Sequence, residues 1–201
     1  MNPLPNRAQF PPQAKTLYTS DQHLWHPNIN RLCGRPYSSC EEAAEAFVDN
    51  WNSVVRPHDN VWVLGDYAMG DVTKGLALLP RLNGHKFLVS GNHDKCWVGH
   101  RDGHKHVGAY LDAGFELVTP WARTRIGVTD VLLSHFPYEG DHSANDRHGD
   151  YRLPDRGKWL IHGHVHEEWK VRGRQINVGV DAWDYTPVSS EALEAIITAA
   201  T

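Results

Sequence analysis

Acidic, amide and imidazole side chains gather in five short clusters along this sequence, and they are the residue types that build metal sites. The clusters are Asp21-Gln22-His23, Gly65-Asp66, Gly91-Asn92-His93-Asp94, His135 and Gly163-His164-Val165-His166. Carboxylate oxygens and imidazole nitrogens bind divalent transition metals, and an amide oxygen can ligate a hard ion. In the third cluster, His93 could instead serve as an acid–base group that Asp94 orients.

Each cluster alone also has an ordinary structural explanation. Asp21 and His23 could be a strand-end carboxylate and a surface imidazole, and a Gly-Asp pair commonly begins a turn. A single His135 is more often a hydrogen-bonded structural residue, and the last cluster could be a polar turn. Asp66, however, follows an apolar segment directly, and a buried carboxylate needs a cation or several donors because an unpaired buried charge is costly.

Every cluster follows an apolar segment that is predicted to be a β-strand. These strands are 15–20, 60–64, 85–90, 131–134 and 158–161. Ligand sites in α/β folds collect at the carboxyl ends of strands, so five strand ends could converge on one place. In extended chain, residues i and i+2 share a face, so Asp21 could reach the same ion as His23, and His164 the same ion as His166.

The remaining pattern predicts further elements around these strands. Residues 41–55 have helical periodicity, with Ala43, Phe47, Trp51 and Val54 along one face. Shorter helices are predicted over 73–79, near 105–112 and over 191–199, further strands over 115–118, 122–126 and 175–180, and a polar loop over 136–157. No repeat or linker divides the chain, so residues 15–201 are predicted to form one domain, preceded by a flexible, proline-rich arm over residues 1–14.

Composition excludes several classes of protein. The chain of 201 residues has a formal net charge of −4, so it does not hold nucleic acid by bulk electrostatics. No apolar run is long enough for a membrane span, and the N-terminus lacks the apolar core of a signal peptide. The three cysteines, Cys33, Cys40 and Cys96, form no C-x-x-C pair and are interpreted as free thiols of a reducing compartment, which predicts a cytoplasmic protein.

Taken in order, the five clusters resemble the motifs of the calcineurin-like metallophosphoesterase superfamily. The resemblance runs from Asp21 to His166, and no ligand position is missing. The segment TSDQHLWHPNI further resembles a branch of small bacterial and phage members that carry an extra His and Asn, here His26 and Asn28. The resemblance implies an α/β fold, a four-layer α/β/β/α sandwich of two mixed sheets flanked by helices, with a two-metal centre where strand ends meet.

The resemblance also implies a role for each motif residue. It assigns Asp21, His23 and His166 to a first ion, Asn92, His135 and His164 to a second, and Asp66 as a bridge. It makes His93 the proton donor to the leaving group, oriented by Asp94, and suggests substrate contacts for His26 and Asn28. The expected cofactors are two divalent transition-metal ions, with Mn²⁺ favoured over Fe, Zn or Ni. Two such ions with one hydroxide attract a phosphate although the whole chain is acidic.

These residues predict a binuclear metal-dependent phosphoesterase. A phosphodiester of nucleotide or cyclic nucleotide type is the favoured substrate, attacked by a metal-bridging hydroxide. One alternative is a phosphomonoesterase, and another is a non-catalytic scaffold with a phosphoesterase-like fold, which the complete ligand set disfavours. Loop arginines such as Arg35 and Arg147 are either phosphate clamps or solvated surface residues.

Overall fold

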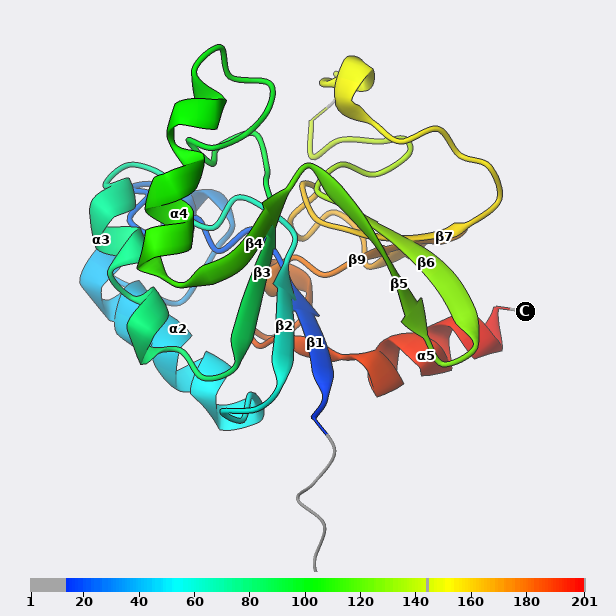
Figure 1. Ribbon diagram of the computed structural model, residues 1–201, viewed down its shortest axis with the longest axis horizontal. Coiled ribbons are helices and arrows are strands. Elements are labelled where there is room, and N and C mark those ends of the chain that lie inside the picture. Colours follow the sequence, from blue (N-terminus) through cyan, green and yellow to red (C-terminus); the bar gives the residue numbers. More distant parts are fainter. Residues whose placement is uncertain (1–13, 144, 201) are drawn as a thin grey trace, which may run out of the picture.

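Two five-stranded mixed sheets face each other in this protein, and helices cover the outside (Figure 1). The computed structural model describes residues 14–143 and 145–200. The predicted α/β sandwich of two mixed sheets is confirmed. Apart from residue 14, the predicted flexible arm lies outside the described residues.

The first sheet has the strand order β10-β1-β2-β3-β4. Its strands are β1 (Thr16–Thr19), β2 (Asn60–Val63), β3 (His85–Val89), β4 (Phe115–Thr119) and β10 (Val188–Ser189). Strands β1 to β4 are parallel and β10 is antiparallel to β1. The carboxyl ends of β1, β2 and β3 therefore lie at one edge of the sheet, and the first three polar clusters follow them.

The second sheet has the strand order β5-β6-β7-β9-β8. Its strands are β5 (Trp121–Ile126), β6 (Thr129–Ser134), β7 (Trp159–His162), β8 (Val171–Arg172) and β9 (Gln175–Asn177). Because β6, β7 and β9 are parallel, the remaining two clusters also lie at a common edge. The strand predicted over 175–180 is too long, because the chain leaves β9 at Asn177.

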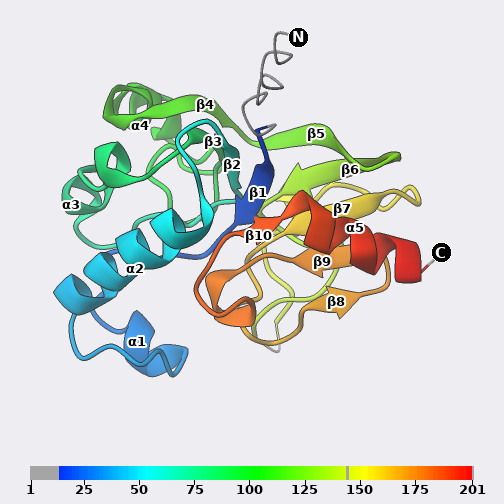
Figure 2. The same cartoon turned by 90° about the horizontal axis from the view of Figure 1, so that it is seen from below.

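Helices flank the two sheets. The α-helices are α1 (Ile29–Leu32), α2 (Cys40–Val54), α3 (Val72–Leu76), α4 (Val107–Ala113) and α5 (Ser190–Ala199), and the 3-10 turns are η1 (Leu79–Arg81), η2 (Gly103–Lys105), η3 (Gly149–Tyr151) and η4 (Val180–Ala182). Helices α2, α3 and α4 lie beside the first sheet, whereas α5 lies toward the second (Figures 1 and 2). The predicted helix 73–79 is split between α3 and η1, where Pro80 lacks the amide donor that a continuous helix needs.

Helix α2 shows why its sequence forms a helix and which face it buries. Ser39 caps the first turn, since its hydroxyl accepts a hydrogen bond from the Glu42 amide. The buried face consists of Ala44, Phe47, Val48 and Trp51, at the i, i+3, i+4, i+7 spacing of an amphipathic helix. The predicted face was wrong at two positions: Ala43 is only partly buried and Val54 is exposed.

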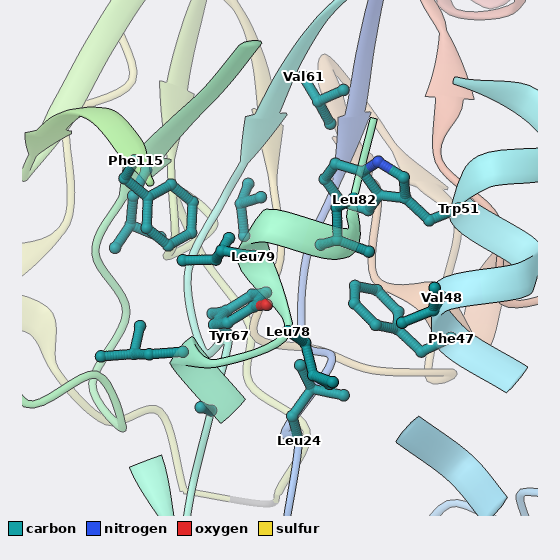
Figure 3. Close-up of a cluster of buried hydrophobic side chains, with 14 of the residues drawn as sticks. Leu24, Phe47, Val48, Trp51, Val61, Tyr67, Leu78, Leu79, Leu82 and Phe115 are labelled. Carbon is teal, nitrogen blue, oxygen red and sulfur yellow. The ribbon is translucent and has the colours of Figure 1, made fainter. Parts of the chain in front are cut away.

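Two hydrophobic clusters stabilise the arrangement. The first packs the α2 face against the outer side of the first sheet, with Tyr67 and Leu79 between them (Figure 3). The second joins residues of both sheets, such as Tyr18 and Ile161, to Leu193 and Ile197 of α5. Burial of these side chains fixes the two sheets together, and hence the relative position of their polar edges.

The helices and the cysteines bear on the expectations about a membrane span and about free thiols. Among the described residues, no helix has the length and apolar character needed to cross a bilayer. Cys33, Cys40 and Cys96 are all free, as the sequence predicted.

Candidate metal centre

The five polar clusters converge where the strand ends of the two sheets meet. Asp21, Asp66 and His135 follow β1, β2 and β6, and each has at most 1% of its surface exposed. They offer ligand atoms that all lie within 4.8 Å of one another. A second group with the same spacing consists of Asp21, His23 and His166. The predicted convergence is therefore present in the fold.

The backbone at this centre adopts a conformation that side-chain-bearing residues rarely take. Asp21, His23, Asp66, His164 and His166 have φ angles of 60°, 49°, 55°, 72° and 48°. Such left-handed residues cluster at functional sites, where surrounding structure holds them in place. Here the first two loops hold each other, because the Asp21 amide donates to the Gly65 carbonyl and the His23 amide to the Asp66 carbonyl. Extended backbone was expected at the pair Asp21 and His23 and at the pair His164 and His166, and this expectation was wrong.

Asp21, His23 and His166 fit a first metal ion. His23 Nε2 lies 3.9 Å from Asp21 Oδ1 and 3.6 Å from Asp66 Oδ2. The His23 and His166 rings stack with their centroids 5.0 Å apart. Burial holds the pKa of His23 well below its usual range, so the ring is neutral, as a ligand must be.

His23 also supplies the test of whether a metal suits the site. The side chain is only 3% exposed, yet neither ring nitrogen has a hydrogen-bond partner in the described part of the chain. Buried polar groups in native proteins are almost always satisfied. A cation among Asp21, Asp66 and His23 would satisfy Nε2 and offset the two buried carboxylates, so the residues fit a divalent ion.

The second predicted ligand set also lies close to Asp66. His135 Nε2 lies 3.2 Å from Asn92 Oδ1 and 3.3 Å from Asp66 Oδ2. The other ring nitrogen, Nδ1, donates to the Leu64 carbonyl at 2.8 Å, which leaves Nε2 facing the site. Asp66 Oδ2 thus lies close to a ligand of each set, as a bridging carboxylate would have to.

His164 is the member of the second set that lies furthest from the others. Its ring centroid is 5.2 Å from that of His135, but its Nε2 is 3.1 Å from Asp141 Oδ2. His164 and His166 therefore do not share one face: His164 faces Asp141, and His166 faces His23. With Nε2 held by Asp141, Nδ1 is the nitrogen that remains for a metal.

Gly163 allows the two halves of the centre to approach. A Cβ at this position would lie 1.9 Å from Ser20 Oγ and 2.4 Å from Asp21 Oδ2. The close approach lets the His164 amide donate to the Asp21 carboxylate at 3.0 Å. The glycine of the last cluster is thus required by packing between the sheets.

His93 and Asp94 have separate positions. The His93 amide donates to Asp66 Oδ1 at 2.8 Å, and its ring lies 5.3 Å from that of His23 and lines the cleft beside the site. Asp94, which the sequence predicted to orient His93, makes no hydrogen bond to that ring among the described residues. Its carboxylate instead accepts from the amides of Gly91, Asp66 and Tyr67 at 2.9 to 3.1 Å. The orienting role was therefore wrong, and Asp94 positions the loops after β2 and β3.

The two predicted substrate contacts also differ from each other. His26 lines the cleft, and its Nδ1 accepts a hydrogen bond from the Asn28 amide at 3.0 Å. The proton of a neutral His26 is therefore on Nε2, the nitrogen free to donate to a ligand. Asn28 is exposed and is not among the residues that line the cleft, but its backbone amide holds the His26 ring.

Sequence reasoning missed Asp181, which holds His166. Asp181 Oδ2 lies 3.4 Å from His166 Nδ1, and Cys33 Sγ lies 3.3 Å from the same nitrogen. Burial alone would lower the pKa of His166, but the hydrogen bonds to Asp181 and Cys33 raise it to about 11. Binding of a metal at Nε2 would have to displace the proton there, so metal affinity depends on pH.

Asp181 is itself fixed by Arg35. The Arg35 guanidinium binds both Asp181 oxygens at 2.7 and 2.8 Å, and it donates to the carbonyls of Asp21 and Gln22. Arg35 is thus neither a phosphate clamp nor a solvated surface residue. It ties the loop after β1 to the carboxylate that orients His166.

Asp141, also missed, gives His164 the same support. Asp141 Oδ1 binds Arg147 at 2.8 Å, while Oδ2 faces His164 Nε2. Each histidine of the last cluster is therefore held by a buried carboxylate that an arginine fixes in turn. Only the general rule that metal-binding imidazoles use their second nitrogen on a carboxylate could have suggested such partners, and it does not say where they lie.

We expect Asp181→Asn to weaken metal binding at the His166 site about 10–100-fold, because outer carboxylates orient the ligand and raise its basicity. Loss of the buried partner of Arg35 would also cost about 3–5 kcal/mol of stability. Metal titration should therefore be done where circular dichroism shows the variant folded. Asp184→Asn is the matched control, since Asp184 is exposed and Asn tolerates its φ of 51°. Unchanged affinity in folded Asp181→Asn would contradict this role.

Comparison with known proteins gives the chain a family. No family model matches it. It is 43% identical over 185 residues to the Gene 66 protein of Mycobacterium phage L5, covering 85% of this chain and 88% of that protein. It is 35% identical over 184 residues to the Gene 66 protein of Mycobacterium phage D29, with 85% and 90% covered. The chain belongs to the family of these Gene 66 proteins.

A solved structure supports the fold. The crystal structure of the protein of unknown function AQ665 from Aquifex aeolicus aligns with a TM-score of 0.68 and 26% identity, covering 91% of this chain and 99% of that one. The phosphopantetheinyl hydrolase of Mycobacterium tuberculosis aligns with a TM-score of 0.33 and 21% identity, over 65% of this chain and 44% of that one. The second likeness is too low to bear on function.

Proposed function

We propose that this protein is a two-metal phosphoesterase of the calcineurin-like metallophosphoesterase type that hydrolyses phosphodiesters, of nucleotide or cyclic nucleotide form. The observation that carries the proposal is the position of Asp66. One oxygen of its carboxylate, Oδ2, lies 3.6 Å from His23 Nε2 and 3.3 Å from His135 Nε2. A carboxylate within reach of ligands from both sets is what a group shared by two adjacent cations requires.

Different residues of the chain would have different roles in such a reaction. Two divalent ions, Mn²⁺ or alternatively Fe, Zn or Ni, would supply Lewis-acid chemistry, lowering the pKa of the attacking water and offsetting phosphate charge. Asp21, His23 and His166 would hold one ion, and Asn92, His135 and His164 the other. His93 would donate a proton to the leaving oxygen, and His26 Nε2–H would bind a phosphate oxygen from the cleft. We place this activity in the cytoplasm, because all three cysteines are free.

The test is hydrolysis of matched monoesters and diesters by metal-free and Mn²⁺-loaded protein. We expect diesters to be cleaved only when metal is present, and elemental analysis to give two ions per chain. His23→Ala should lose one ion, whereas His58→Ala, an exposed histidine outside the centre, should keep both. Preference for monoesters would favour a phosphomonoesterase. Two bound ions without turnover of any ester would favour a non-catalytic scaffold, and a single ion would contradict the two-metal centre.

A further inference from the structure

A cleft opens directly beside the candidate metal centre. His23, His93 and His166 form part of its wall, so a phosphate held at the centre would have its organic substituent in this cleft. The cleft has a volume of about 350 Å³. That is within the range of clefts that bind small organic molecules.

Three of the residues that line the cleft have large apolar side chains. Ile29 and Leu32 of α1 face it together with Met69. Leu32 is 58% exposed, so its side chain is available to a group bound in the cleft. These three side chains suit an aromatic or aliphatic group rather than a charged one.

Two of the residues that line the cleft are acidic. Glu167 and Glu168 follow His166 directly, both are exposed, and neither carboxylate forms an ion pair among the described residues, although a Glu167 oxygen lies within 4.8 Å of a His166 ring nitrogen. No lysine or arginine of the described chain lines the cleft. Arg147 reaches the lining residue His142 from behind, but Asp141 neutralises it. A second phosphate in this cleft would therefore meet negative charge.

We propose that the cleft selects phosphoesters that carry one negative charge and an uncharged apolar or aromatic substituent, and that it rejects polyanions such as nucleoside polyphosphates and nucleic acid strands. The proposal rests on the proposed function, since it assigns the substituent of the same substrate. The substituent lies against Ile29, Leu32 and Met69. Glu167 and Glu168 repel any further phosphate that enters the cleft beyond the one held at the centre.

A matched series of nitrophenyl diesters tests the selectivity, because every member releases the same leaving group. The members are methyl nitrophenyl phosphate, phenyl nitrophenyl phosphate, the nitrophenyl ester of thymidine 5′-monophosphate, and the same thymidine ester with an added 3′-phosphate. We expect the Mn²⁺-loaded protein to prefer phenyl over methyl, and the thymidine ester over its 3′-phosphorylated form. Equal or faster cleavage of the 3′-phosphorylated ester would overturn the proposal.

Substitutions at Glu167, Glu168 and Leu32 test which residues produce the selectivity. The double variant Glu167→Gln/Glu168→Gln should raise kcat/KM for the 3′-phosphorylated ester relative to the plain thymidine ester by roughly five-fold, from the loss of two nearby charges. Leu32→Ser should reduce the preference for phenyl over methyl. Glu41→Gln, an exposed glutamate of α2 outside the cleft, is the control and should change neither ratio. An unchanged charge ratio in the double variant would contradict the role of the two glutamates.

Binding measurements separate this proposal from the proposed function. Titration calorimetry on the Mn²⁺-loaded protein should show tighter binding of thymidine 5′-monophosphate than of thymidine 3′,5′-bisphosphate, with a smaller difference in the double variant. If no ester is cleaved but this order holds, the proposed catalysis fails and the cleft assignment stands. If the bisphosphate binds as tightly, or neither ligand binds, the cleft assignment fails whatever the turnover.

Discussion

His93→Ala is expected to lower the rate of diester hydrolysis by about 10²–10⁴-fold while the protein keeps both metal ions, because a positioned general acid contributes about that much. The ring of His93 lies in the cleft, and only its backbone amide contacts Asp66. Alanine preserves that amide, so the metal ligands should stay in place. The measurements are the rate at saturating Mn²⁺ and the metal content of the same sample.

The leaving group decides whether His93 is a proton donor. A basic alkoxide needs protonation as it departs, whereas a nitrophenolate leaves unaided. The deficit of His93→Ala should therefore grow with the basicity of the leaving group. A deficit that is constant across such a series would show that His93 binds the phosphate instead. The exposed His58→Ala should behave as wild type throughout.

Asp66→Asn should reduce hydrolysis further than either His93→Ala or Asp21→Asn. Asp66 Oδ2 lies 3.6 Å from His23 Nε2 and 3.3 Å from His135 Nε2, so an amide there should weaken both ion sites, whereas Asp21 is proposed as a ligand of the first ion only. Metal content should fall below two ions per chain in Asp66→Asn. The rise in melting temperature on adding Mn²⁺, which reports binding to the folded state, should largely disappear.

Asp112→Asn is a matched control for this change, since Asp112 is an exposed aspartate of α4. It should retain two ions and the full Mn²⁺-dependent rise in melting temperature. Two ions bound with wild-type affinity and a near-normal rate in Asp66→Asn would show that this carboxylate does not bridge.

Local patterns of the sequence were sufficient for the elements that end at the centre. The apolar segments before Asp21, Asp66 and His135 are strands, because each is short, rich in β-branched or aliphatic residues and followed by a polar break. Strands β8 and β10 were not predicted, because each has only two residues, too few to show the alternation of apolar and polar side chains that marks a strand. The buried face of α2 was displaced at Ala43 and Val54, because periodicity gives a helix but only packing chooses which side meets the sheet.

The sequence by itself determined which residue types stand at the five strand ends, and so the chemistry of a metal centre. Tertiary structure decided what holds them. Asp141 comes from a loop and Asp181 from the turn η4, and neither local sequence has a recognisable metal-site spacing; they reach His164 and His166 through the packing of the fold. The left-handed backbone at these histidines likewise depends on contacts between loops that are distant in sequence. So does the position of Asp94, whose carboxylate accepts from three backbone amides and does not bind the His93 ring. Local propensity depends only on neighbouring residues along the chain. A buried carboxylate or amide instead pairs with whichever group the fold brings within hydrogen-bonding distance.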